Sequence, residues 1–281
     1  MSAIKIGIIG GSGVYKIEGV EVTREHKVTT PFGAPSADVM EASLNGASFY
    51  FIPRHGKGHT LTPSEVNYRA NIFALKELGV EYIISVSAVG SLKEEFSPGS
   101  FVIPDQFIDW TKGKRERTFF GNGIVGHTSV AEPVDNELQK MIVAACKDVG
   151  VKHGAGGSYI CIEGPQFSTK AESNIYRSFG ASVIGMTNVP ESYLAKEAGI
   201  AYATIAMVTD YDCWRDEHCT LEEIMKVMAG NNFQAHSILK NLLPRLKSNP
   251  FIIKKENGNS VMSKPEKLSP EQSHILEVLM R

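Results

Sequence analysis

The amino-acid sequence predicts an α/β fold: a single domain with a central mixed β-sheet flanked by helices. Short apolar runs with the composition of buried strands alternate along the chain with longer segments of helical spacing. The length of 281 residues suits one domain of this class, and the hydrophobic content of 42% suits an ordinary globular core. Because we find no internal repeat and no second domain, we interpret residues 1–281 as one unit.

The predicted strands are apolar and end at glycine, proline or small hydroxyl residues. They are expected over residues 4–9, 48–52, 82–86, 101–103, 159–162, 183–186 and 201–208. The predicted helices begin at capping signals or end at glycine. They are expected over residues 64–78 (with Ser64 as the N-cap), 137–149 and 191–198, after a capping box at 169–172, and from a second capping box at 220–223 toward residue 246, unless Pro244 shortens that helix.

The last part of the chain has a different composition. Residues 248–268 are polar and are punctuated by Ser248-Asn249-Pro250 and Asn257-Gly258-Asn259-Ser260, which predicts a polar arm. Residues 269–281 then form a predicted C-terminal apolar helix that opens with Ser269-Pro270-Glu271-Gln272. Since its apolar residues need a surface to cover them, this helix is expected to dock.

The composition argues against several classes of protein. The formal net charge is -2 and no block of Lys or Arg dominates, so nucleic acid is not an expected partner. No apolar run approaches the ~20 residues that span a bilayer, and the first residues lack the apolar core of a signal peptide. The four cysteines have neither C-x-x-C nor C-x-C spacing, so no metal site is expected. We expect a cytoplasmic protein.

The segment Thr209-Asp210-Tyr211-Asp212 places two carboxylates two residues apart, directly after the apolar run 201–208. Ligands of α/β proteins bind beyond the carboxyl ends of buried strands. Alternation along an extended chain sends Asp210 and Asp212 to the same side. Two acids at the mouth of a pocket are candidates for a proton donor or for a clamp on a polar heterocycle. The alternative is a solvated loop end, because Asp is mostly exposed.

Other predicted strand ends carry residues suited to an anion. Gly10-Gly11-Ser12-Gly13 would let backbone N–H groups and a hydroxyl approach it, although it fits neither the dinucleotide, the P-loop nor the nucleophile-elbow pattern. Arg54 matches a phosphate bidentately, and His55 adds an imidazole. Ser87 and Thr187 add hydroxyls, unless they only cap the next element. Together these residues predict a site for a tetrahedral oxyanion.

These segments resemble those of the trimeric nucleoside phosphorylase family, and most closely its methylthioadenosine phosphorylases. The resemblance covers about residues 4–245, and its motifs follow one another in the family's order. The matching segments are Gly7-Ile8-Ile9-Gly10-Gly11-Ser12-Gly13, Arg54-His55-Gly56, Asn67-Tyr68-Arg69-Ala70-Asn71, Ser87-Ala88-Val89-Gly90-Ser91-Leu92, Asp105-Gln106-Phe107-Ile108-Asp109, Ile162-Glu163-Gly164-Pro165-Gln166-Phe167-Ser168 and Thr209-Asp210-Tyr211-Asp212.

The resemblance implies a phosphorolysis in which orthophosphate attacks C1′ of S-methyl-5′-thioadenosine and displaces adenine. The residues it implies for phosphate binding are Ser12, Arg54, His55, Ser87, Ala88 and Thr187. Those implied for the nucleoside are Met186 at the ribose, Phe167, Tyr211, Asp212 and Asp210, of which Asp210 is the catalytic proton donor. Ser168 and Leu221 fall where the family tunes substrate preference, and Gly185 replaces the Asn of some relatives.

The resemblance also implies an assembly. The expected state is a homotrimer, alone or doubled to a hexamer, in which His127 is lent by a neighbouring subunit to the 5′ end of the sugar. The C-terminal segment near Leu279 would close the same pocket. No cofactor and no metal are expected, because orthophosphate is a co-substrate. The expected partners are therefore a small-molecule nucleoside, phosphate and further copies of the chain.

Three alternatives stay open. The first is a phosphorylase for adenosine or for 6-oxopurine nucleosides, although a pair of Asp residues favours a 6-amino group. The second is a serine hydrolase with Ser12 as nucleophile and His55 and Asp210 as its partners, against which the failed elbow pattern counts. The third is a module that binds a nucleoside without cleaving it.

Overall fold

The computed structural model describes residues 4–11, 17–215, 221–255, 257 and 260–281. Its main sheet has the strand order β2 (Glu21–His26), β3 (Val39–Leu44), β4 (Ala47–Pro53), β1 (Ile6–Gly10), β5 (Tyr82–Ser91), β10 (Ala181–Gly185), β9 (Ser158–Ile162) and β7 (Gln106–Trp110). Further strands extend the sheet: β11 (Ala201–Asp210) pairs with β5 and β6 (Phe101–Ile103), and β6 pairs with β8 (His153–Ala155). Since β1 runs parallel to β4 and β5 whereas β10 runs antiparallel to β5, the predicted mixed sheet is confirmed.

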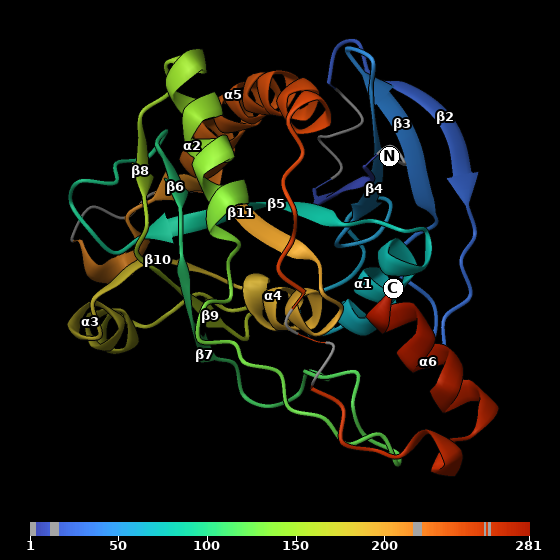
Figure 1. Ribbon diagram of the computed structural model, residues 1–281. Coiled ribbons are helices and arrows are strands. Elements are labelled where there is room, and N and C mark those ends of the chain that lie inside the picture. The colour runs from blue at the N-terminus through green and yellow to red at the C-terminus, as the bar shows by residue number, and fades with distance from the viewer. Residues whose placement is uncertain (1–3, 12–16, 216–220, 256, 258–259) are drawn as a thin grey trace.

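Helices cover both sides of this sheet. α2 (Asn136–Val149) and α5 (Leu221–Ser248) lie on one side of β5 and β11, and α1 (Tyr68–Glu77) and α4 (Asn188–Glu197) lie on the other (Figure 1). α3 (Lys170–Ser178) packs on β10, and α6 (Pro270–Met280) packs on α1. Two short 3-10 turns, η2 (Asp212–Trp214) and η4 (Pro265–Lys267), complete the described elements. The predicted α/β class is therefore confirmed.

The ends of most predicted helices agree with the structure. The capping boxes of α3 and α6 are both formed. α5 continues through Pro244 to Ser248, so the proline does not shorten it. The capping box predicted at 220–223 lies partly outside the described residues. Within the described ranges, no helix is long and apolar enough to cross a membrane.

The start of α1 differs from the prediction. The helix begins after Asn67, whose side chain accepts a hydrogen bond from the Ala70 N–H and so caps the first turn. Ser64, the predicted N-cap, instead donates its hydroxyl to the carboxylate of Glu163. A partner that lies 99 residues away in the chain therefore determines where this hydroxyl points. Local capping preferences could not reveal that contact.

β5 is longer than predicted. The sequence predicts a strand over 82–86, whereas β5 continues through Ser87 and Ala88 to Ser91. Both residues stay extended because β11 pairs with this part of β5, with Ala206 opposite Ser87 and Met207 opposite Ala88. Strands β2, β3, β7 and β8 were not predicted either. β2 in particular is almost wholly exposed and has no apolar pattern.

The register of the sheet brings distant segments to one edge. Gly10 is opposite Pro53 in the parallel pair of β1 and β4, so the residues that follow both strands meet. Ile9 is opposite Ser85, which places Ser87 beyond the end of β1 although it lies inside its own strand. This edge, at the carboxyl ends of β1, β4 and β11, is where an α/β sheet binds its ligands.

Candidate active site

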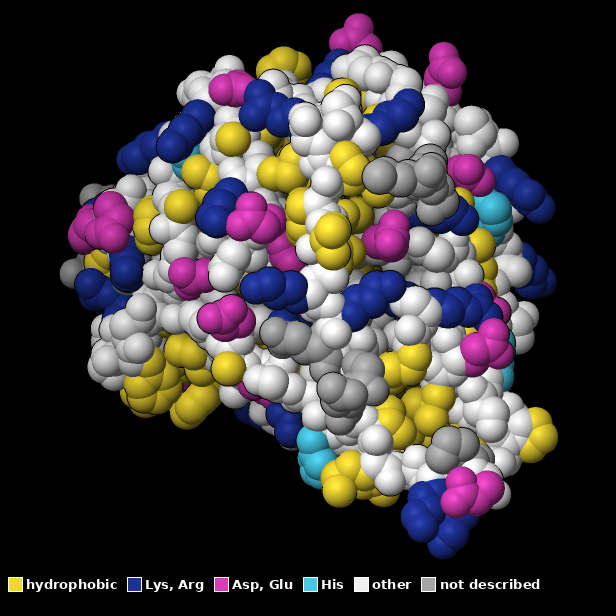
Figure 2. Space-filling view, in the orientation of Figure 1, with side chains coloured by type: hydrophobic (Ala, Val, Ile, Leu, Met, Phe, Trp, Pro, Cys, Tyr) yellow, Lys and Arg dark blue, Asp and Glu magenta, His cyan; other side chains and the backbone are white. Residues whose placement is uncertain are grey.

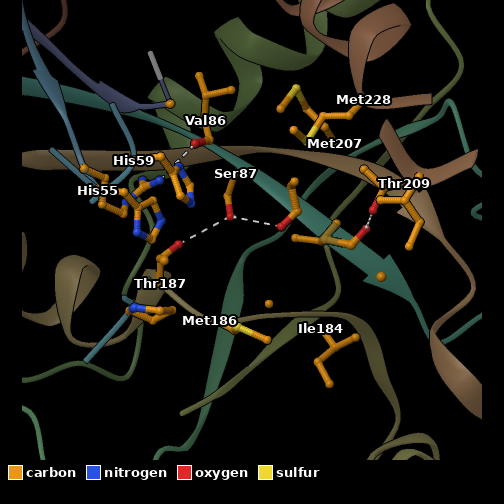
Figure 3. Close-up of a pocket in the computed structure, with 18 of the residues that line it drawn as sticks. His55, His59, Val86, Ser87, Ile184, Met186, Thr187, Met207, Thr209 and Met228 are labelled. Carbon is orange, nitrogen blue, oxygen red and sulfur yellow. Dashed lines mark hydrogen bonds between the residues drawn. The ribbon is translucent and has the colours of Figure 1, made fainter. Parts of the chain in front are cut away.

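One cavity of about 610 Å³ opens at this edge of the sheet (Figure 3). Most of the residues that the sequence assigns to a site lie around it. Those in its lining are Arg54, His55, Ser87, Ala88, Phe167, Ser168, Met186, Thr187, Asp210 and Asp212. Ser12 lies outside the described residues, and so does the side chain of Leu221. Tyr211 and His127 do not line the cavity.

Arg54 is 2% exposed and is held by an acid that the sequence interpretation missed. Its Nε and Nη2 atoms donate to the carboxylate of Glu191 at 2.7 and 2.9 Å, and Nη1 donates to the Val86 carbonyl at 3.1 Å. Although burial alone would lower the pKa of Arg54, the carboxylate of Glu191 raises it. The guanidinium edge formed by Nε and Nη2 is thus already occupied by a carboxylate. Its charge is balanced within the protein.

His55 is neutral in this environment. Its Nδ1 lies 2.9 Å from the Leu61 carbonyl oxygen, which can only accept, so Nδ1 carries the proton and Nε2 is left as an acceptor. Burial, followed by the positive charge of Arg54, lowers the pKa of His55 to about 4. The ring stacks on that of His59 at a centroid distance of 4.5 Å. His55 therefore contributes an uncharged imidazole to the cavity wall.

Two hydroxyls from different elements lie close together at the end of the cavity near Arg54 and His55. Ser87 Oγ on β5 lies 3.4 Å from Thr187 Oγ1, just after β10 (Figure 3). Thr187 occupies the N-cap position of α4, yet its side chain makes no capping hydrogen bond. The capping role considered for this residue is thus absent. Together with neutral His55 and the charge-balanced Arg54, these hydroxyls make a polar end of the cavity that presents dipoles more than net charge.

The two acids lie together at another part of the wall. Asp210 accepts hydrogen bonds from Thr209 Oγ1 at 2.6 Å and from the Asp212 N–H at 2.9 Å. Burial, with a smaller contribution from the charge of Asp210, raises the pKa of Asp212, whose Oδ2 atom is buried without a partner among the described residues. A Cβ atom at Gly90 would lie 3.3 Å from Asp210 Oδ2, so a glycine lets this pair approach β5 closely.

Tyr211 lies between the acids but points elsewhere. Its hydroxyl reaches the Glu94 carbonyl at 3.4 Å, and the guanidinium of Arg215 lies 3.9 Å from its ring centroid. The structure therefore places Tyr211 in the packing of the η2 turn and not at the cavity. The extended alternation expected through this segment ends with β11 at Asp210, because Asp212 has a φ of 51° and begins the η2 turn.

The remaining wall comes from two loops and from α5. Phe167 is 74% exposed at the cavity mouth, and the buried Ser168 Oγ has no partner in the described part of the chain. α5 contributes residues that the sequence interpretation missed, although they recur at helical spacing: Ile224, Met228, Asn232, Ala235, His236 and Leu239. Ile224, Met228 and Leu239 make this side of the cavity largely apolar.

His127 and Leu279 lie away from the cavity of their own chain. The His127 N–H donates to the Ser260 carbonyl at 2.8 Å, which joins the segment around residue 125 to the polar arm. Leu279, a residue of α6, is fully buried in the core and is not part of the cavity lining. In the described ranges, no group of three or more His, Cys, Asp or Glu side chains is arranged to hold a metal ion.

Known proteins share both the sequence and the fold. The family model described as the Phosphorylase superfamily matches residues 5–244. S-methyl-5′-thioadenosine phosphorylase of Geobacter sulfurreducens is 54% identical over 243 residues, which cover 86% of this chain and 85% of that protein. The enzyme of the same name from Rhodospirillum rubrum is 48% identical over 280 residues, or 98% of this chain and 95% of that protein.

Solved structures give the same result. A methylthioadenosine phosphorylase from an antarctic soil metagenomic library has a TM-score of 0.94 and 44% identity, with complete coverage of both chains. A methylthioadenosine phosphorylase from Schistosoma mansoni in complex with adenine has a TM-score of 0.86 and 36% identity, and covers 92% of this chain and 99% of that one. By sequence and by fold, this chain belongs to the phosphorylase superfamily.

Proposed function

We propose that the chain catalyses phosphorolysis of S-methyl-5′-thioadenosine to adenine and 5-methylthioribose 1-phosphate. The proposal rests on one observation: a single cavity joins a set of anion-binding groups around Ser87 and Thr187 to the acid pair Asp210 and Asp212. A nucleophilic phosphate and a leaving base need such groups in the same pocket. The names of the relatives supply the substrate.

Phosphate is the nucleophile in this proposal. One of its oxygens forms a bond to C1′ while the bond from C1′ to N9 of the base breaks, and the bonding electrons leave with adenine. Negative charge on the phosphate also stabilises the positive charge that develops on the sugar. Arg54, His55, Ser87 and Thr187 act by positioning the anion, since it needs no deprotonation to react.

The acid pair assists the departure of adenine. Adenine leaves poorly as an anion, and a proton delivered to N7 makes it a better leaving group. We assign that proton to Asp210 and the contact with the 6-amino group to Asp212. The Asp212 N–H joins the two acids, and burial raises the pKa of Asp212, which supports a role for this pair at the leaving base.

The cavity also supports a preference at the 5′ position. The α5 side presents Ile224, Met228 and Leu239, which suits a thiomethyl group better than a hydroxyl. An adenine-release assay with and without phosphate, on 5′-methylthio and 5′-hydroxy substrates, tests both points. We expect phosphate-dependent release that is faster with methylthioadenosine, and inosine as a poor substrate.

The same assay separates the other candidates. Faster turnover of inosine would favour a 6-oxopurine phosphorylase, and binding of adenosine without release of adenine would favour a non-catalytic module. A serine hydrolase would cleave esters without phosphate. Its triad has no structural support, because His55 donates to Leu61 whereas Asp210 accepts from Thr209 and Asp212. We propose that no cofactor takes part, so activity should survive dialysis against EDTA.

We further propose a homotrimer with shared sites, alone or paired as a hexamer. The position of His127 outside its own cavity is consistent with a role in a neighbouring one. Mass measurement in solution tests the assembly. Co-expression of Asp210→Asn and His127→Ala chains tests the sharing, since mixed trimers would contain sites with both native residues. Activity in the mixture above that of either variant alone is expected, and its absence would contradict the shared site.

A further inference from the structure

Tyr159 has a buried hydroxyl that lies directly behind the end of the cavity lined by Ser87 and Thr187. It lies on β9 with 0% exposure and is not part of the cavity lining. Its Oη atom lies 3.5 Å from Ser87 Oγ, which in turn lies 3.4 Å from Thr187 Oγ1. Three hydroxyls thus lead from the interior of the sheet to the cavity wall, and Figure 3 shows the last step of this line.

Tyr159 favours one direction of hydrogen bonding along this line. Burial raises its pKa to about 12, so the hydroxyl keeps its proton and needs an acceptor. A serine hydroxyl has one hydrogen and two lone pairs. If Ser87 accepts from Tyr159 behind it, its own hydrogen is left to point elsewhere. Ser87 can then donate this hydrogen to an anion in the cavity.

The distances leave room for this adjustment. Both separations exceed the ~2.7–2.8 Å of a strong bond between hydroxyls, and the Ala88 carbonyl, also within reach of Ser87 Oγ, is 3.4 Å away. None of these three contacts among the described residues is short enough to fix the Ser87 hydroxyl in another direction. An anion in the cavity can therefore capture the Ser87 hydrogen while Tyr159 supports the oxygen from the back.

Gly185 makes space for the tyrosine hydroxyl. A Cβ atom at this position would lie 2.6 Å from Tyr159 Cζ and even closer to Oη, which no real side chain tolerates. The backbone of Gly185 does not have a positive φ, so conformation alone does not require glycine there. Glycine is required because any larger residue would overlap the Tyr159 hydroxyl.

The ring of Tyr159 is also held from its other side. Phe107 on β7 packs against it edge-on, at a centroid distance of 5.7 Å. Strand pairing places β9 between β7 and β10, so Phe107 and Gly185 approach the ring from the two neighbouring strands. The hydroxyl therefore has a defined place behind Ser87.

We propose that Tyr159 is a positioning residue for the phosphate nucleophile, which acts by orienting the Ser87 hydroxyl in the space left by Gly185. The proposal rests on the phosphorolysis proposed above. It accounts for a buried polar group that the reaction does not touch, and it assigns Gly185 a role in phosphate binding through its neighbour.

Tyr159→Phe removes the hydroxyl and keeps the ring packed on Phe107. Because a hydrogen bond contributes modestly to binding, we expect the KM for phosphate to rise about three- to tenfold, with the KM for methylthioadenosine nearly unchanged. Tyr82→Phe is the matched control: Tyr82 is also buried on the sheet, but its hydroxyl donates to the Phe251 carbonyl outside the cavity. This control should leave both KM values unchanged.

A second comparison tests the route through Ser87. In a Ser87→Ala background, Tyr159→Phe should cause no further rise in the KM for phosphate, because the hydroxyl on which it acts is gone. An equal additional rise in that background would overturn the proposal, as would a change of less than about threefold in the single variant. Equal melting temperatures of Tyr159→Phe and the wild type confirm that folding is intact.

The wild-type assay keeps this proposal separate from the proposed function. If the wild type releases adenine only with phosphate, the phosphorolysis stands, and the variants then test Tyr159 alone. A merely structural role would lower the active fraction, and with it the apparent kcat, without changing either KM.

Discussion

Glu191 holds Arg54 by two hydrogen bonds, from Nε at 2.7 Å and from Nη2 at 2.9 Å, within the wall of the cavity. Both side chains are almost fully buried, and Ser85 and Tyr202 also donate to the same carboxylate. An isolated arginine beneath the phosphate would add a full positive charge to the site. The pair instead provides an oriented, nearly neutral group, so hydroxyls and N–H dipoles must supply much of the anion affinity.

Removal of Glu191 should be costly for the fold. Glu191→Ala leaves a buried guanidinium without its partner, so we expect the free energy of unfolding to fall by about 3–5 kcal/mol. Urea unfolding measures this change. Glu25→Ala, which breaks the exposed pair with Lys57, is the control and should cost less than about 1 kcal/mol. Similar losses in the two variants would contradict a structural role for the buried pair.

Replacement of both members of the pair separates stability from phosphate binding. In Arg54→Met/Glu191→Leu no unpaired charge is left, so stability should recover most of the loss seen in Glu191→Ala. The KM for phosphate should nevertheless stay raised and kcat lowered, because the guanidinium is missing. A double variant with native phosphate dependence would show that Arg54 does not position the anion.

Asp210→Asn tests the proton donor. An amide can still donate a hydrogen bond to N7 but cannot deliver a proton, so kcat on methylthioadenosine should fall by ~10²–10⁴-fold. Steady-state kinetics at several pH values provide the measurement. The loss should persist at every pH, because the amide of the variant has no proton to deliver at any of them. A wild-type kcat in Asp210→Asn would rule out its role as the acid.

Phe167→Ala tests the cavity mouth. Because the ring is 74% exposed, its removal should change the free energy of unfolding by less than about 0.5 kcal/mol. If the ring covers the bound base, the KM for the nucleoside should rise while the KM for phosphate stays the same. Phe233, also 74% exposed but outside the cavity lining, is the matched control. Phe233→Ala should leave both constants unchanged.

His55 makes stability depend on pH. Its pKa is about 4 in the folded protein and near 6.5 when exposed, so the unfolded chain binds the proton more readily. The contribution of neutral His55 is fully present above about pH 6.5 and is lost as the pH falls toward 4. Denaturant unfolding across this range should show a weaker pH dependence in His55→Gln. An identical slope in the variant and the wild type would be inconsistent with a buried neutral imidazole.

Sequence patterns alone predicted the fold class and many of the residues that line the cavity. Continuous apolar runs that alternate with capped helical segments predict a layered α/β protein, because buried strands and amphipathic helices have few other ways to pack. Polar residues at strand ends, such as His55 and Asp210, were predicted because parallel strands bring their carboxyl ends to one edge. Thr187 reaches the same cavity by another route, since β10 runs antiparallel to β5.

Tertiary structure alone decided which groups support those residues. Glu191 and Tyr159 lie 137 and 72 residues from Arg54 and Ser87, and no local pattern links them. Tyr211 shares a motif with the two acids, yet its side chain turns away from the cavity. A strand end specifies which edge of the sheet a residue reaches. The hydrogen-bond partner, charge and orientation of that residue depend on side chains from other strands and helices. Those side chains contact the residue only after the sheet has folded.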